Sequence, residues 1–284
     1  MIKLENVVLA SPEQMEFIIE GMRNPMNSWE KSDSYISHEF NLENKASHKV
    51  FKLKEADHSL MQRLSNAGTE HRKYMRMMPV YVRITAPLYW WKEFDTYKVG
   101  TVANSCSTMH KIAEKEFTLE DFSCEHLLSA SSSEDERTVP MIDVSPYHDS
   151  SIKYSPNGWL TGAVYLLNKC RKWYLETKDK KYWWQMIQLL PSSYNQTRNV
   201  MLNYEVLANI YRQRHSHKLD EWREFCKWIE SLPYSELIIG FKEYDTVEYA
   251  KEHPDFADQI KDAVEKMTKS VPCENKLEED ENNV

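Results

Sequence analysis

Glycine is scarce in this sequence, with only 6 glycines among 284 residues. Neither G-x-G-x-x-G nor G-x-x-x-x-G-K-[ST] occurs, which excludes the glycine-rich phosphate loops of dinucleotide-binding and P-loop folds. Any phosphate-bearing ligand would therefore be held by side chains and helix ends.

Cysteine patterns and long apolar runs are missing as well. The five cysteines are odd in number, and no CxxC pair occurs, so we expect neither a disulfide framework nor a closed zinc site. The start, MIKLENVVLASPEQ, lacks the apolar core of a signal peptide, and no apolar run approaches the ~20 residues that span a bilayer. We expect a reduced, cytoplasmic protein that does not associate with membranes.

Positive charge is in deficit, because the formal net charge is −8. Sequence-independent binding of duplex nucleic acid needs a field of Lys and Arg, so we expect no nucleic-acid partner. The hydrophobic content of 41% is enough for a substantial core. We predict one domain over residues 1–272 and a disordered acidic tail over 273–284.

Apolar periodicity predicts a mixed first half. Residues 2–9 are typical of a strand, and Ser11 followed by Pro12 predicts the start of a helix. A second helix is predicted over 55–67 and a strand over 74–85, in which Val80, Val82 and Ile84 alternate with Arg83. A helix through Trp90 and Trp91 should follow.

The second half is predicted to be mainly helical. Residues 123–158 contain SASSSEDER and several turn signals, which indicates a long loop or insertion. We predict a helix over 159–179 and one or two long helices over 198–231. Early strands, many helices and no regular βαβ alternation favour an α+β fold.

One predicted helix carries a polar face. In a helix from Arg198, Asn203 and Arg214 are eleven residues apart and would share a face, because each residue turns roughly 100°. An adjacent face would carry Glu205, Asn209 and Arg212. Such a helix could line a polar cleft. The alternative is a solvated surface with an internal Glu205–Arg212 pair.

A second polar segment lies at 104–108, NSCST. Its hydroxyls and amide could present donors to a phosphate, with Lys92 and Lys98 adding positive charge nearby. The alternative is a polar turn that caps a helix starting near Ser107.

These segments, in this order, resemble the flavin-dependent thymidylate synthase family. The resemblance spans roughly residues 1–111 and 180–230. It begins with Ala67-Gly68-Thr69-Glu70 for the family's A-G-H-E, continues with a strand and Ala86-Pro87, and places Lys92-Glu93 at the family's R-Q pair. YKVGTVANSCSTMH (97–110) lies over the signature R-H-R-x-x-S-x-N-E-x-S-x-R-Y. Downstream, Leu190-Pro191, Tyr194, Asn203, Asn209 and Arg214 fall at the family's spacing.

The signature is degenerate where it normally carries charge. Tyr97-Lys98-Val99 replaces R-H-R, Ser105 replaces the Glu, Met109 replaces the last Arg, and Glu205 stands at an Arg position. Each lost arginine removes charge-assisted hydrogen bonds worth roughly 1.5–3 kcal/mol. Either nearby cations compensate, for which the candidates are Lys92, Lys111, Arg198 and Arg212, or the ligand has changed.

The resemblance implies a central, mostly antiparallel sheet with long helices, and a homotetramer with sites between subunits. It implies an FAD-dependent methyltransferase that moves a one-carbon unit from methylenetetrahydrofolate to carbon 5 of dUMP, with NADPH as reductant. Ser107 and Arg214 would act at the substrate in catalysis. The implied flavin contacts are Tyr97, Lys98, Asn104, Ser105, Asn203, Glu205 and Asn209. The implied substrate contacts are Lys92, Glu93, Ser107, Arg212 and Arg214.

Two alternatives stay open. The chain could modify another pyrimidine nucleotide with the same cofactors, for example by hydroxymethylation, or it could be a non-catalytic nucleotide-binding or interaction protein on the same scaffold. We expect no metal site, because His215 and His217 have no Cys or carboxylate partner nearby in the sequence.

Overall fold

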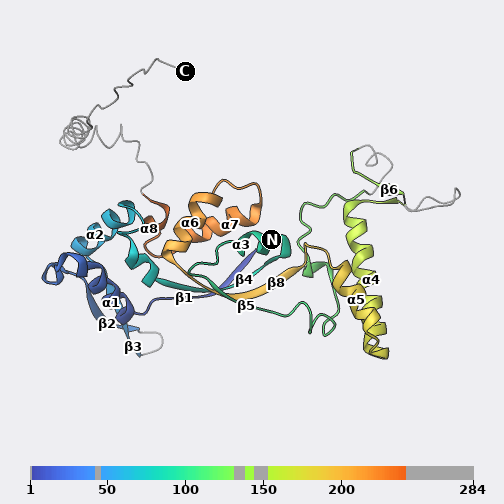
Figure 1. Ribbon diagram of the computed structural model, residues 1–284, viewed down its shortest axis with the longest axis horizontal. Helices are drawn as coiled ribbons and strands as arrows, with labels where there is room; N and C mark the ends of the chain where they lie inside the picture. The colour runs from blue at the N-terminus through green and yellow to red at the C-terminus, as the bar shows by residue number, and fades with distance from the viewer. Residues whose placement is uncertain (1, 42–45, 131–137, 144–152, 241–284) are drawn as a thin grey trace, which may run out of the picture. The chain divides into compact units, whose positions relative to one another are not determined.

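A computed structural model describes residues 2–41, 46–130, 138–143 and 153–240. Its main sheet has four strands in the order β1-β4-β8-β5, and every neighbouring pair is antiparallel (Figure 1). The strands are β1 (Lys3–Leu9), β4 (Pro79–Pro87), β5 (Val102–Ser105) and β8 (Asn195–Asn203). The α+β expectation with an antiparallel sheet is confirmed.

The sheet buries one face. In β4 the predicted alternation is confirmed, since Val80, Val82 and Ile84 are buried and Arg83 is exposed. The predicted strand began too early, because residues 73–77 form a 3-10 helix, η3 (Lys73–Met77). The buried face packs against four helices, whose apolar residues join it in one core: α1 (Pro12–Arg23), α3 (Leu88–Phe94), α6 (Tyr204–Arg214) and α7 (Asp220–Glu230).

The first helix, α1 (Pro12–Arg23), begins as predicted. Ser11 caps it, and Gln14 completes a capping box with a 2.8 Å bond from the Ser11 N–H. Short 3-10 turns, η1 (Asn24–Met26) and η2 (Trp29–Lys31), lead to a separate hairpin of β2 (Tyr35–Asn41) and β3 (Ala46–Lys52).

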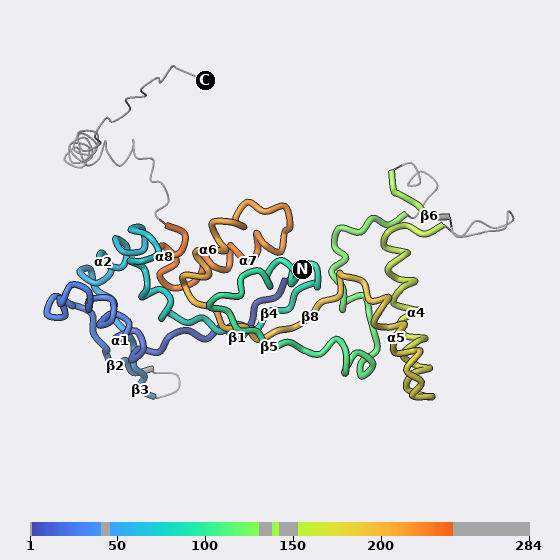
Figure 2. The backbone as a smooth tube through the Cα atoms, in the orientation of Figure 1, coloured from blue at the N-terminus to red at the C-terminus, as the bar shows by residue number. Residues whose placement is uncertain are grey.

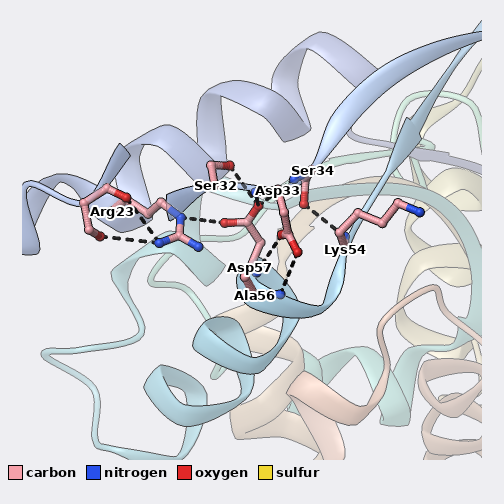
Figure 3. A network of polar contacts seen from close by, with 8 residues as sticks. Arg23, Ser32, Asp33, Ser34, Lys54, Ala56 and Asp57 are labelled. Atoms are coloured by element: carbon pink, nitrogen blue, oxygen red, sulfur yellow. Dashed lines mark hydrogen bonds and ion pairs between the residues drawn. The ribbon is translucent and has the colours of Figure 1, made fainter. Parts of the chain in front are cut away.

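Helix α2 (Glu55–Asn66) is fastened to α1 and to the segment before β2 (Figure 3). The buried Asp57 carboxylate lies 2.6 Å from Arg23 Nε and also accepts hydrogen bonds from the Ser32 hydroxyl and the backbone N–H groups of Asp33 and Ser34. Asp33 in turn accepts from the N–H groups of Ala56 and Asp57 in the first turn of α2. We call Arg23, Ser32, Asp33, Ser34 and Asp57 the Asp57 network.

Two strands of the sheet continue directly into helices. The chain passes from β4 into α3 (Leu88–Phe94) and from β8 into α6 (Tyr204–Arg214), as the tube in Figure 2 shows. The predicted helix over 198–231 is therefore wrong in its first part. Residues 198–203 are strand, with Val200 facing the core, and the helices are α6, α7 (Asp220–Glu230) and the short α8 (Glu236–Ile239).

A second core lies around α4 (Pro156–Thr177) and α5 (Lys180–Leu189). It includes Phe117, Phe122, Leu160, Leu167 and Met186. The described part of 123–158 is irregular apart from the two-residue strands β6 (Ile142–Asp143) and β7 (Lys153–Tyr154) and the first residues of α4, and η4 (Leu119–Asp121) precedes it.

The part of the predicted domain over 241–272 and the predicted acidic tail over 273–284 lie outside the described residues. Among the helices that are described, none combines the length and apolarity that a bilayer crossing requires.

Candidate functional site

The LPSSY segment between α5 and β8 positions helix α3. Carbonyl groups of Ser192 and Tyr194 accept hydrogen bonds from the N–H groups of Tyr89 and Leu88, each 3.0 Å long. These contacts satisfy donors in the first turn of α3, which no side chain caps. The segment that the resemblance singled out thus fixes the helix that carries Lys92 and Glu93.

Helix α3 meets the end of α6 in a polar cluster. Glu93 Oε2 accepts hydrogen bonds from Arg214 Nη1 at 2.8 Å and from Trp222 Nε1 at 2.9 Å. Arg214 Nε donates to the Tyr97 hydroxyl at 2.9 Å. His217 Nε2 lies 3.5 Å from the same Glu93 oxygen. We call Glu93, Tyr97, Arg214, His217 and Trp222 the Arg214 cluster.

The Arg214 cluster is only partly closed. The side chains of Arg214 and Glu93 are 19% and 35% exposed. The guanidinium carbon lies 4.9 Å from the centre of the Trp222 ring, so the cation is held against an aromatic face. Arg214 has five N–H groups, and its contacts to Glu93 and Tyr97 use two of them, so others can still bind a ligand.

A second arginine contacts α3 and the residue that follows it. Arg198 of β8 forms a 2.7 Å ion pair with Asp95, and its guanidinium carbon is 4.1 Å from the centre of the Trp91 ring. Gln196 accepts at 3.0 Å from Arg198 Nε, and its amide donates to the Cys106 carbonyl at 2.8 Å. Arg198 is thus tied to the end of β5, within the degenerate signature.

The start of α6 is buried and carries an acid. Asn203 ends β8 and caps α6, accepting a 3.0 Å hydrogen bond from Val206 N–H. Glu205, predicted either to meet a flavin or to pair with Arg212, lies 2.8 Å from Arg72, with both side chains about 90% buried. The contact is an ion pair without good hydrogen-bond alignment. The solvated Glu205–Arg212 alternative is therefore wrong.

A tight turn faces the cap. Gly100 has a φ of +79°, and a side chain there would come within 3.0 Å of the Asn203 amide nitrogen. The hydroxyl of the next residue, Thr101, is buried without a hydrogen-bond partner. Lys98, in the same turn, is exposed.

The predicted residues at 104–107 lie on the edge strand and in the turn after it. Asn104 pairs with Asn199 and Ser105 with Arg198, so Ser105 shares the covered face with Arg198 while Asn104 lies on the open face. The polar turn of that alternative is present, since the Ser107 hydroxyl accepts from His110 N–H at 2.9 Å, but the helix predicted to start there is absent. Cys106, between the edge strand and this turn, is exposed.

On the open face, Asn104 lines a depression of about 300 Å³ with residues of all four strands, among them Tyr81, Arg83 and Asn199. The remaining predicted residues lie outside the Arg214 cluster and this depression. Asn209 accepts a hydrogen bond from Arg212 one turn on, and Arg212 and Lys92 are exposed.

Within one chain, the predicted residues therefore form two groups. Glu93, Tyr97 and Arg214 meet on the covered side of the sheet, whereas Asn104 is on its open side. Sequence reasoning missed Trp222 and His217. A buried tryptophan needs an acceptor for its indole N–H. This requirement is the one feature of the sequence that could have indicated that Trp222 contacts a polar side chain.

This arrangement defines a class of fold. A central antiparallel sheet with long helices is the architecture that the resemblance predicted. The chain has the flavin-dependent thymidylate synthase fold.

Two of the solved structures to which the chain is similar support this assignment. The chain is similar to thymidylate synthase X of Helicobacter pylori with FAD and dUMP, at 16% identity over 84% of this chain and 96% of the other, with a TM-score of 0.51. A second structure of the H. pylori enzyme with both ligands gives 16% identity, 83% and 95% coverage and a TM-score of 0.50. The UMP/dUMP methylase PolB of Streptomyces cacaoi, bound with 5-Br UMP, gives 11% identity, 81% and 88% coverage and a TM-score of 0.47. No family model and no curated protein matches the sequence.

Metal ligands do not gather in the described ranges, where no group of three or more His, Cys, Asp or Glu residues could hold an ion.

Proposed function

We propose that this chain is a flavin-dependent enzyme that binds FAD and modifies a dUMP-like pyrimidine nucleotide. The observation that carries the proposal is the Arg214 cluster. Two segments more than a hundred residues apart in the sequence, which the resemblance assigned to one pocket, supply its Glu93 and Arg214. The fold, shared with enzymes whose structures contain FAD and dUMP, adds support.

The residues around the start of α6 fit a flavin. The unpartnered Thr101 hydroxyl suits the uncharged, hydrogen-bonding edge of an isoalloxazine ring. The amides of Asn209, further along α6, and of Asn104, on the open face of another copy, would suit the same edge. The acid at Glu205 is compatible because Arg72 neutralises it. The turn at Gly100 is bordered by Asn203, Tyr97 and Lys98. The exposed Lys98 could bind a phosphate of the cofactor.

Arg214 would hold the nucleotide. Glu93 and Tyr97 fix its guanidinium in place, so binding costs little side-chain entropy, and the N–H groups left over donate to the pyrimidine or phosphate. Lys92 and Arg212 supply further exposed positive charge, and Ser107 would contribute a hydroxyl from another chain. Because Asn104 and Arg214 lie on opposite sides of the sheet in one chain, a complete pocket requires segments of different copies, as in a homotetramer.

The finer proposal is thymidylate synthesis. FAD, when bound and reduced by NADPH, would supply the chemistry that moves a one-carbon unit from methylenetetrahydrofolate to carbon 5 of dUMP. The protein's part is to orient the pyrimidine through Arg214 and to exclude water. Modification of another pyrimidine, such as hydroxymethylation, is the second candidate, and the replaced arginines support it because they change the donors that surround the ligand.

Absorbance and turnover test the proposal. We expect the purified chain to carry or take up FAD with its yellow absorbance bands. With reduced flavin and methylenetetrahydrofolate, we expect dUMP-dependent oxidation, and the mass of the product separates a methyl from a hydroxymethyl group. A protein that binds dUMP but rejects FAD would instead be a nucleotide-binding protein on this scaffold. A protein that binds neither would refute the proposal.

A further inference from the structure

Arg72 and Glu205 form a buried ion pair whose hydrogen-bonding groups lack protein partners. Arg72 lies just before η3, and Glu205 is the second residue of α6. The two residues are only 8% and 7% exposed, and Arg72 Nε lies 2.8 Å from Glu205 Oε2. Both atoms are buried without an aligned hydrogen bond. Within the described ranges, the other polar atoms of these side chains have no hydrogen-bond partner either, but they are not fully enclosed, so a ligand can reach them.

The Arg23–Asp57 pair shows how a purely structural pair is satisfied in this chain. The Asp57 carboxylate accepts hydrogen bonds from a guanidinium, a hydroxyl and two backbone N–H groups. Arg72 and Glu205 are buried nearly as deeply and have none, although an unmade hydrogen bond on a buried group costs stability. Such groups point to a partner from outside the chain.

The Arg72–Glu205 pair presents donors beside an acceptor. Arg72 has five N–H groups and no acceptor, whereas an ionised Glu205 only accepts. Because the two charges neutralise each other, the pair suits an uncharged ligand group, and Glu205 would repel a phosphate. An imide edge, in which a carbonyl adjoins an N–H, has the complementary order of acceptor and donor. This edge occurs in the isoalloxazine ring of a flavin and in the uracil of dUMP.

We propose that Arg72 and Glu205 together bind the imide edge of a ligand. Arg72 donates to a carbonyl oxygen, and Glu205 accepts from the imide N–H. The inference rests on the proposed function, because that function supplies both ligands that carry an imide. Glu205 follows Asn203 by two residues, and Asn203 faces the turn that holds the unpartnered Thr101 hydroxyl. The flavin is therefore the expected ligand, and the uracil is the other source that the experiment distinguishes.

Methylated ligands test the imide N–H directly. We expect the wild type to bind 3-methyl-FAD at least about tenfold more weakly than FAD, because the methyl group removes the donor that Glu205 accepts. The adenine and the phosphates are the same in both ligands, so the comparison reports on the imide alone. The same comparison of dUMP with 3-methyl-dUMP tests the uracil. Selectivity found only with the nucleotide would assign the imide to uracil.

A paired substitution tests the two side chains without leaving a buried charge. Arg72→Met combined with Glu205→Leu replaces the pair by apolar residues, which for a buried ion pair is often neutral or stabilising. We expect this double variant to be as stable in urea as the wild type, to bind FAD at least about tenfold more weakly, and to lose the selectivity against 3-methyl-FAD. Arg76→Met, at an exposed arginine of η3, is the matched control and should behave as the wild type does.

Two results would overturn the proposal. One is a wild type that binds the methylated and unmethylated forms of both ligands equally, which needs no variant to fold. The other is a folded double variant that keeps the affinity and selectivity of the wild type, because Arg72 and Glu205 would then be structural only. Both results leave FAD binding by the wild type intact, whereas a wild type that binds neither FAD nor dUMP refutes the proposed function and this inference together.

Discussion

Two arginine–carboxylate pairs join distant segments of this chain, and their surroundings differ. Arg23 and Asp57 have side chains only 4% and 0% exposed, and every Asp57 oxygen has a protein donor (Figure 3). Arg214 and Glu93 are 19% and 35% exposed, and the arginine keeps unused donors. The first pair is saturated and holds helices together. The second is held in place yet open, which is what a ligand site requires.

Asp57→Asn should give the largest effect, because it leaves Arg23 as a buried charge without its counter-ion. We expect a loss of about 3–5 kcal/mol in the free energy of unfolding, measured by urea denaturation. Glu13→Gln, which removes an exposed partner of Lys49, is the control and should change little. Equal stability of Asp57→Asn and wild type would show that the network is not structural.

Lowering the pH should also remove the stability that Asp57 contributes, with a smaller effect than the substitution. Burial raises the pKa of the Asp57 carboxyl, but hydrogen bonds from Ser34, Ser32 and Arg23 outweigh it and lower the pKa to about 2. Because the folded pKa lies below the unfolded one, this stability is fully present above about pH 4 and is lost as the pH falls toward 2. It amounts to about 2 kcal/mol. Unfolding free energies of wild type and Asp57→Asn should converge over this window, and parallel curves would contradict the assignment.

Arg214→Ala should act on binding. Losing one or two charge-assisted hydrogen bonds should weaken the affinity for dUMP by about ten- to a hundredfold, measured by calorimetry. Arg76→Ala is the control, because Arg76 is an exposed arginine outside the Asp57 network and the Arg214 cluster. If Arg214→Ala binds dUMP with unchanged affinity, the nucleotide pocket does not include Arg214.

Glu93→Gln should have the smallest effect and the opposite sign. It keeps an acceptor for Trp222 but removes a negative charge beside the ligand, so dUMP should bind up to about tenfold more tightly at low salt. The gain should shrink as the salt concentration rises. Weaker binding would mean that Glu93 contacts the ligand itself.

Local signals predicted much of the fold. The Ser11–Gln14 capping box and the alternation of Val80, Val82 and Ile84 are encoded within a few residues, so they could be predicted directly. Strand β8 could not, because Val200, Tyr204, Leu207 and Tyr211 share a helical spacing although the first belongs to a strand. Only pairing with β4, more than a hundred residues earlier, decides that Val200 is in a strand.

The members of the candidate site could be proposed from the sequence, but their contacts could not. The family resemblance pointed to Glu93 and Arg214 separately, yet their ion pair depends on how α6 packs on α3. The Arg72–Glu205 pair joins segments with no shared pattern, so its partner could not be predicted from spacing. The structure also separates Asn104 from Arg214 by the sheet, which no linear motif can express.

Asn203 is both the last residue of β8 and the cap of α6, and this has a mechanical consequence. With no loop to absorb a change, a slip of β8 by one residue would turn the helix by about 100° and carry Arg214 away from Glu93. Insertions at this junction should therefore be far more harmful than insertions in the 123–158 segment. The hydrogen bonds that hold β8 in the sheet also determine the direction in which Arg214 points, eleven residues after Asn203.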